Sequence, residues 1–163
     1  MISKHISEKE ATKSITALRL GIANTPNGTA LANMKILAEK IFEPLRKFVG
    51  GPIKINSMFR SEALNKQIGG SSRSQHCQGN AMDIDDIYGY KTNKEMFDFI
   101  KENLDFDQLI YEFGNEENPD WVHVSYVDKE KNRNKILKAV RDKGKTMYVD
   151  ITNGWKNKLW EKY

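Results

Sequence analysis

A change of hydrophobic period at Gly50-Gly51-Pro52 restricts the fold of this 163-residue chain more than any other feature. After the break, the segment PIKINSMF alternates between apolar and polar residues, as a β-strand does. The sequence therefore predicts an α+β fold in which N-terminal helices pack on a mostly antiparallel sheet. Before the break, six apolar residues recur at helical spacing and are expected to be core: Leu31, Met34, Leu37, Ile41, Leu45 and Phe48.

Capping signals predict further helices on both sides of this break. An S-x-x-E box at Ser7 indicates a helix that begins there and fades by Gly21. A second box at Thr92 predicts a helix through about Asn103. The segment SEALNKQI predicts a short helix before the loop GGSSRSQ, and we expect the side chain of Asn65 to tie this loop to the helix.

Short apolar stretches separated by turn residues predict the rest of the sheet. FDQLIYEF and WVHVSYV flank the turn-rich GNEENPD and are predicted to form an antiparallel hairpin. AMDID is interpreted as the end of a strand. ILKAV and TMYVDI flank RDKGK, which favours a second hairpin, although the first half fits a helix equally well.

The length is that of one domain, so we expect residues 1–163 to share one core. Within it we expect a helical part over about 1–50, a core that carries the functional site over about 52–126 and a basic C-terminal segment over 127–163. No apolar run reaches the roughly 18 to 20 residues of a membrane span, and no signal peptide is evident, so synthesis in the cytoplasm is expected. The single cysteine, Cys77, excludes an internal disulfide and is interpreted as a packing residue.

The formal charge of +4 is a modest basic excess. Much of it lies in KEKNRNKILKAVRDKGK, which we interpret as a solvated basic surface. No interleaving of aromatic and basic residues supports nucleic-acid binding, so no nucleic-acid partner is expected. We expect a monomer.

Two of the three histidines lie in surroundings typical of a metal site. His76 and Asp83 are seven residues apart, with Gly79 between them to let the chain bend. His123 lies in WVHVS, where strand alternation puts its imidazole on the face opposite the core. Two imidazoles and one carboxylate form the three-ligand set of a catalytic zinc site, in which the metal lowers the pKa of water to roughly 7.

Sequence blocks over roughly residues 52–126 resemble a known family of peptidoglycan metallopeptidases. These are the zinc D-alanyl-D-alanine carboxypeptidases and L-alanyl-D-glutamate endopeptidases, which share a hedgehog-like fold. IFEPLR before the glycines resembles the branch found in phages. The blocks are Ser57-Met58-Phe59-Arg60-Ser61, Asn65, Gly69-Gly70, Ser74-Gln75-His76, Gly79, Ala81, Asp83-Ile84, Phe106-Asp107-Gln108-Leu109-Ile110 and Trp121-Val122-His123-Val124-Ser125.

The resemblance implies a role for each matching residue. It implies that a zinc ion (Zn2+) is held by three ligands, which are His76, Asp83 and His123. Arg60 would meet a substrate carboxylate or the developing oxyanion, for which its planar fork is suited. Ser74 and Gln75 would line the substrate.

The general base is where this sequence departs from the family pattern. Many relatives have Glu three residues before the last histidine, whereas this chain has the shorter Asp120 there. A base must come within hydrogen-bond reach of the attacking water. We therefore prefer Glu112, at the end of the preceding predicted strand, and expect Asp120 to shape the loop before Trp121.

The resemblance implies an enzyme that cuts a stem peptide of peptidoglycan by metal-activated water. A binding module of the same fold, which holds zinc or wall peptide without turnover, is the alternative. The sequence leaves open whether the scissile bond is D-Ala-D-Ala or L-Ala-D-Glu. With no signal peptide evident, we expect action on the cell wall after release of the kind that phage lysins use.

Overall fold

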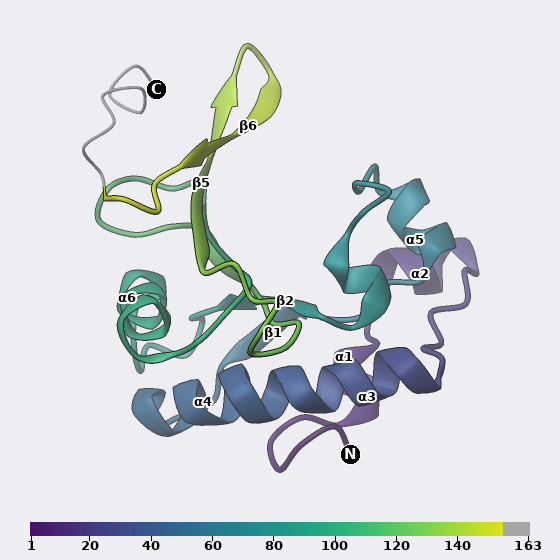
Figure 1. Ribbon diagram of the computed structural model, residues 1–163. Coiled ribbons are helices and arrows are strands. Elements are labelled where there is room, and N and C mark those ends of the chain that lie inside the picture. Colours follow the sequence, from purple (N-terminus) through teal and green to yellow (C-terminus); the bar gives the residue numbers. More distant parts are fainter. Residues whose placement is uncertain (155–163) are drawn as a thin grey trace.

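A computed structural model describes residues 1–154 as helices around a mixed sheet, which confirms the predicted α+β class (Figure 1). Helix α3 (Gly28–Leu37), the π-helical turn η1 (Ala38–Phe42) and helix α4 (Glu43–Val49) follow one another without a break and form one long rod. Helix α6 (Asn93–Asn103) begins at the predicted capping box, in which both reciprocal hydrogen bonds are present. Helix α5 (Glu62–Gln67) is the predicted short helix.

Six strands of the described chain form one sheet, in the order β1-β2-β4-β3-β5-β6. Only β3 and β5 run parallel, and every other neighbouring pair is antiparallel. The prediction that AMDID is merely a strand end is wrong, because it forms a full strand with hydrogen-bonded neighbours on both sides. The strands are β1 (Lys54–Ser57), β2 (Ala81–Asp85), β3 (Gln108–Glu112), β4 (Trp121–Ser125), β5 (Lys135–Asp142) and β6 (Lys145–Asp150).

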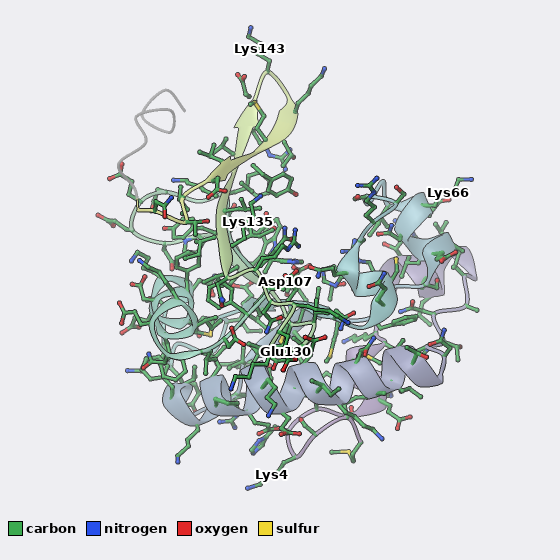
Figure 2. The ribbon with its side chains drawn as sticks, viewed as in Figure 1. Lys4, Lys66, Asp107, Glu130, Lys135 and Lys143 are labelled. Atoms are coloured by element: carbon green, nitrogen blue, oxygen red, sulfur yellow. The ribbon has the colours of Figure 1, made fainter. Side chains whose placement is uncertain are left out.

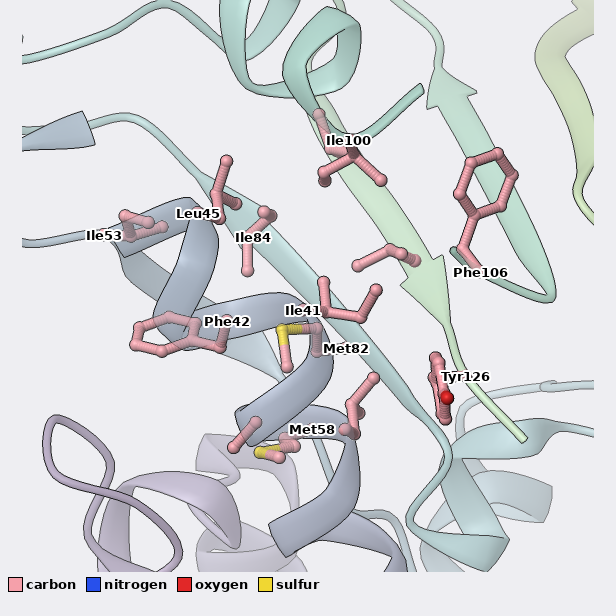
Figure 3. Close-up of a cluster of buried hydrophobic side chains, with 14 of the residues drawn as sticks. Ile41, Phe42, Leu45, Ile53, Met58, Met82, Ile84, Ile100, Phe106 and Tyr126 are labelled. Carbon is pink, nitrogen blue, oxygen red and sulfur yellow. The ribbon is translucent and has the colours of Figure 1, made fainter. Parts of the chain in front are cut away.

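The register of the sheet separates an apolar face from a polar one. On the apolar face, Met82 and Ile84 of β2 join a cluster that includes Ile41 and Leu45 of the helical rod and Ile100 of α6 (Figure 3). Each of these five side chains is fully buried. The rod and α6 therefore cover one face of the sheet, and the other face is left for the polar residues.

The predicted helix from Ser7 to Gly21 is wrong in one respect, since two short helices replace it. The hydroxyl of Ser7 caps α1 (Glu8–Ala11), and the hydroxyl of Ser14 accepts from the amide of Ala17 to start α2 (Ile15–Leu20). Because Ser14 is an extended residue that caps a new helix, the first helix ends before it. Gly21 ends α2 in the left-handed conformation.

Phe48 is not a core residue, contrary to the prediction. Its side chain is 37 % exposed and stacks on Phe99 of α6, with ring centroids 4.2 Å apart. Val49, four residues after the buried Leu45, takes the inward position at the end of the rod. Helical spacing after Leu45 allows either Phe48 or Val49 to face the sheet, and in the structure Val49 does.

The C-terminal segment forms the predicted hairpin, β5–β6, and its helical alternative is wrong. Lys143 and Gly144 at the turn both have positive φ, as the type I′ two-residue hairpin turn requires. The interpretation of this region as a wholly solvated basic surface is also wrong in part, since Lys138 lies in β5 and is buried. Residues 155–163 of the predicted C-terminal segment lie outside the described residues. Among the described helices, none has the length and apolar character that a membrane crossing demands.

Candidate metal centre

Three side chains from distant parts of the sequence converge on the polar face of the sheet. They are His76 on the short helix η2 (Gln75–Gln78), Asp83 on β2 and His123 on β4, and one ligand atom from each lies within 4.8 Å of the others. Asp83 and His123 are direct partners in the β2–β4 ladder. The sheet itself therefore sets the distance between two members of the group, and η2 brings the third.

His76 is held so that one ring nitrogen is available to a ligand. Its Nδ1 lies 2.8 Å from the carbonyl oxygen of Met58, which can only accept a hydrogen bond, so the proton belongs on Nδ1. Its Nε2 is buried and makes no hydrogen bond with any described residue, although it lies 3.3 Å from Oδ2 of Asp83. A backbone carbonyl that fixes the tautomer in this way is the usual support of a metal-ligating histidine.

A glycine lets η2 approach the helical rod. Gly79 has a φ of +75°, and a Cβ atom there would lie 2.4 Å from the carbonyl oxygen of Ala30 in α3. Both the backbone conformation and the close contact favour glycine at this position. The predicted bend between His76 and Asp83 is therefore also the point where the turn packs on α3.

The charges in the group suit a divalent cation. Nδ1 of His123 lies 2.9 Å from Oδ1 of Asp83. Burial alone would raise the pKa of the Asp83 carboxyl, but the two facing imidazoles outweigh it and hold that pKa well below its usual value. Burial lowers the pKa of His76, and the facing Asp83 carboxylate opposes part of that effect. Two imidazoles and a carboxylate are the donor set of a mononuclear zinc site with one open position, so the residues fit zinc.

Glu112 lies beside this group, at the end of β3. Ile110, two residues before it, is the ladder partner of His123, so Glu112 is on the same face and diagonal to that imidazole. Its side chain is 6 % exposed. Burial raises the pKa of the Glu112 carboxyl to about 7, with a further increase from Asp83 and an opposing effect of His123. The pKa of this carboxyl is therefore near the value that suits a general base at neutral pH.

Asp120 lies apart from the group. It is exposed and does not line the groove that contains His76 and Glu112. The hydrogen bonds of Asp120 are made by its backbone. Its amide donates to the carbonyl oxygen of Glu112, and its carbonyl oxygen accepts from the side chain of Asn93. These contacts position the residue at the start of β4.

The candidate metal-binding group, His76, Asp83 and His123, lies in a groove of about 880 Å³. One side of this groove is the loop 69–75 after α5, and the other includes Arg141 and Tyr148 of the β5–β6 hairpin. Figure 2 marks the two sides with Lys66 on α5 and Lys143 at the hairpin tip. Arg60, Ser74 and Gln75, which the sequence pointed to as substrate-binding residues, all line the groove.

Asp107 anchors the groove, a role that the sequence alone did not indicate. Its carboxylate is 2 % exposed and accepts from Nε2 of Gln75 at 2.8 Å. It also accepts from Nε and Nη2 of Arg133 at 2.9 and 2.7 Å. Asn65 fixes the same loop from its other end, since its side chain donates to the carbonyl oxygen of Ser71 at 2.8 Å, as predicted.

Asp107→Asn should lower the free energy of unfolding at pH 7 by about 1 to 3 kcal/mol, because charge-assisted hydrogen bonds are lost. Burial alone would raise the pKa of Asp107, but the hydrogen bonds from Arg133 and Gln75 outweigh it and lower that pKa. The stabilisation is therefore complete above the unfolded pKa of roughly 4 and is lost as pH falls through the folded pKa. Urea unfolding of both proteins should show the difference shrinking below about pH 4. An undiminished difference near pH 3, or an equal loss in the exposed control Glu117→Gln, would contradict this.

A partly buried three-ligand group with a buried carboxylate beside it, in a groove on the polar face of an α+β sheet, defines a mononuclear metallohydrolase site. The family model of peptidase M15 matches residues 4–125, and the chain belongs to this family. It is therefore a hydrolase, a zinc metallopeptidase. None of the curated proteins matches the sequence.

Proposed function

We propose that this chain hydrolyses an amide bond in the stem peptide of peptidoglycan, with zinc held by His76, Asp83 and His123. The observation that carries the proposal is the convergence of the three ligand atoms within 4.8 Å, in the same groove as a buried carboxylate. Membership of the M15 family, whose peptidases depend on zinc and act on peptidoglycan, supports the choice of metal and substrate.

Glu112 is the proton-transfer group of the proposed reaction. Zinc, when bound, supplies a Lewis acid that polarises the amide carbonyl and increases the acidity of water. The Glu112 carboxylate accepts a proton from the attacking water and delivers it to the leaving amine. Its raised pKa supports both steps, because a carboxyl with a pKa of about 7 gains and loses a proton readily at neutral pH.

Arg60 stabilises negative charge on the reacting carbonyl oxygen or on a substrate carboxylate. Its backbone amide donates to the carbonyl oxygen of His76 at 3.2 Å, which ties it to a proposed metal ligand. Its Nε is buried and has no hydrogen-bond partner among the described residues. Arg60 lines the groove, so its positive charge would stabilise negative charge that develops on a substrate oxygen there.

Arg60→Lys should lower kcat/KM at least tenfold, or roughly 1.4 kcal/mol of transition-state stabilisation. Lysine keeps the positive charge but lacks the planar guanidinium with its paired N–H donors. A lower kcat/KM in this variant would therefore show that the geometry of the donors matters as well as the charge. The melting temperature should remain nearly unchanged, because Arg60 makes no ion pair with a described residue. Kinetics on muropeptides and thermal unfolding test this, and a variant with wild-type kcat/KM would refute the role.

Gln75 and Ser74 are the groups proposed to hold the substrate backbone. Oε1 of Gln75 is buried without a hydrogen-bond partner in the described chain, while its Nε2 is fixed by Asp107. Gln75 lines the groove, and Asp107 keeps its side-chain amide oriented there. Ser74 is half-buried and lines the groove next to it.

Mass spectrometry of purified peptidoglycan digested with the zinc-loaded protein tests the proposal. New termini at D-Ala-D-Ala would make the enzyme a carboxypeptidase, and new termini at L-Ala-D-Glu would make it an endopeptidase. Release of no peptide at any zinc concentration would refute hydrolysis and favour the binding-module alternative.

A further inference from the structure

The groove extends beyond the metal-binding group over a separate apolar floor. Ile110, Leu137 and Ala139 form a small buried cluster on β3 and β5, against which Phe113 packs. Ile110 pairs with both His123 and Leu137 across the sheet. The floor therefore begins directly beside a proposed metal ligand and runs toward the β5–β6 hairpin.

A cation is held at the far end of this floor. Arg141 is two residues beyond Ala139 in β5 and so lies on the same face. Its guanidinium carbon is 4.7 Å from the centroid of the Phe113 ring, and that ring packs on Trp121 at 5.4 Å. Stacking on an aromatic ring limits the positions that a long side chain can adopt.

The aromatic support under Arg141 is itself in an unusual conformation. Phe113 has a φ of +55°, a left-handed backbone that a bulky side chain rarely adopts. Its amide donates to the carbonyl oxygen of Ala139 at 3.1 Å, which fixes it to β5. Backbone strain of this kind persists where surrounding contacts impose it and gathers at ligand sites.

Arg141 is available to an anion. None of the ion pairs among described residues involves it, in contrast to Arg133, which is paired with Asp107. The side chain lines the groove together with Tyr148 of β6. Both residues lie outside the segment 4–125 that the family model matches, so this wall is not part of the matched core.

We propose that Ile110, Leu137 and Arg141 form a subsite for an acidic residue of the peptide substrate. The apolar floor receives the aliphatic part of that residue, and the guanidinium of Arg141 binds its carboxylate through paired hydrogen bonds. The inference rests on the proposed function only in taking the ligand to be a stem peptide. The carboxylate is either that of the D-glutamate or that of the C-terminus.

Three synthetic stem peptides test the subsite: one with free carboxylates, one amidated at D-glutamate and one amidated at the C-terminus. For wild type, one of the two amidations should lower kcat/KM about ten- to hundredfold, the usual cost of a hydrogen bond to a charged group. In Arg141→Gln, the same amidation should have almost no effect. The control Lys145→Gln, which removes a charge of the same hairpin outside the groove lining, should keep the wild-type preference.

Calorimetric binding of the same peptides separates this inference from the proposed function. If wild type cleaves none of them but binds the acid form more tightly than one amide, and Arg141→Gln abolishes that difference, hydrolysis is refuted and the subsite stands. If Arg141→Gln keeps the full wild-type penalty for both amidations, or if wild type neither binds nor cleaves any of the peptides, the subsite is overturned.

Discussion

Replacing Glu112 by glutamine is expected to reduce kcat by roughly 10² to 10⁴-fold, the typical contribution of a positioned general base. Glutamine has nearly the same shape but cannot accept the proton of the attacking water. Glu112 is 6 % exposed, and its carboxylate accepts no hydrogen bond from a described residue, so the change to glutamine breaks no native hydrogen bond. Zinc content and melting temperature should therefore match those of wild type.

The matched control is Asp120→Asn, at the position where many relatives have their glutamate. This side chain is exposed and outside the groove lining, so the variant should keep most of the activity. Steady-state kinetics on muropeptides, with metal analysis of each sample, distinguishes the two. An inactive Asp120→Asn together with an active Glu112→Gln would assign the base to Asp120 instead.

Removal of either proposed imidazole ligand should abolish both bound zinc and activity. His76→Ala leaves one imidazole and one carboxylate, and His123→Ala does the same, and two ligands do not complete a catalytic zinc site. Elemental analysis of the purified proteins measures the metal directly, and wild type should contain one zinc per chain.

The third histidine provides the control for this experiment. His5 lies 2.7 Å from a carboxylate oxygen of Glu43, remote from the groove lining, so His5→Ala should retain zinc and turnover. Because His76 is 1 % exposed, its variant could lose metal through misfolding, and far-UV circular dichroism must accompany the assay. His123 is less buried, with its side chain 13 % exposed, and gives an independent test. Full zinc occupancy in both alanine variants would refute the assignment of His76 and His123 as zinc ligands.

Local patterns were sufficient for most of the fold because each element carries its own signal. The capping box at Thr92 and the helical spacing before Gly50 each specify structure within a few residues. Two of the errors occurred where two neighbouring signals competed. Ser14 adds a second cap inside what looked like one helix, and Phe48 competes with Val49 for one inward position.

The residues of the candidate site were predictable from their chemistry, whereas the contacts that hold them in place were not. The ligand set and the preference for Glu112 came from side-chain chemistry and sequence blocks, and the structure brings these residues into one groove. The support of His76 could not be foreseen, because it is a backbone carbonyl of Met58, and every residue has one. The sequence did not distinguish Arg141 from the other cations of its basic segment. It lines the groove because β5 pairs in parallel with β3.

The sheet also divides the groove by the ease of local opening. Strands β2 and β4, which carry Asp83 and His123, have neighbours on both sides and a fully buried apolar face. Strand β6 pairs only with β5, and most of its residues are exposed. Free energies of local unfolding follow burial and backbone pairing, so local opening is expected to cost less at β6 than at β2 and β4. Backbone amides of β6 should therefore exchange with solvent sooner than those of β2 and β4, whose pairing holds Asp83 opposite His123.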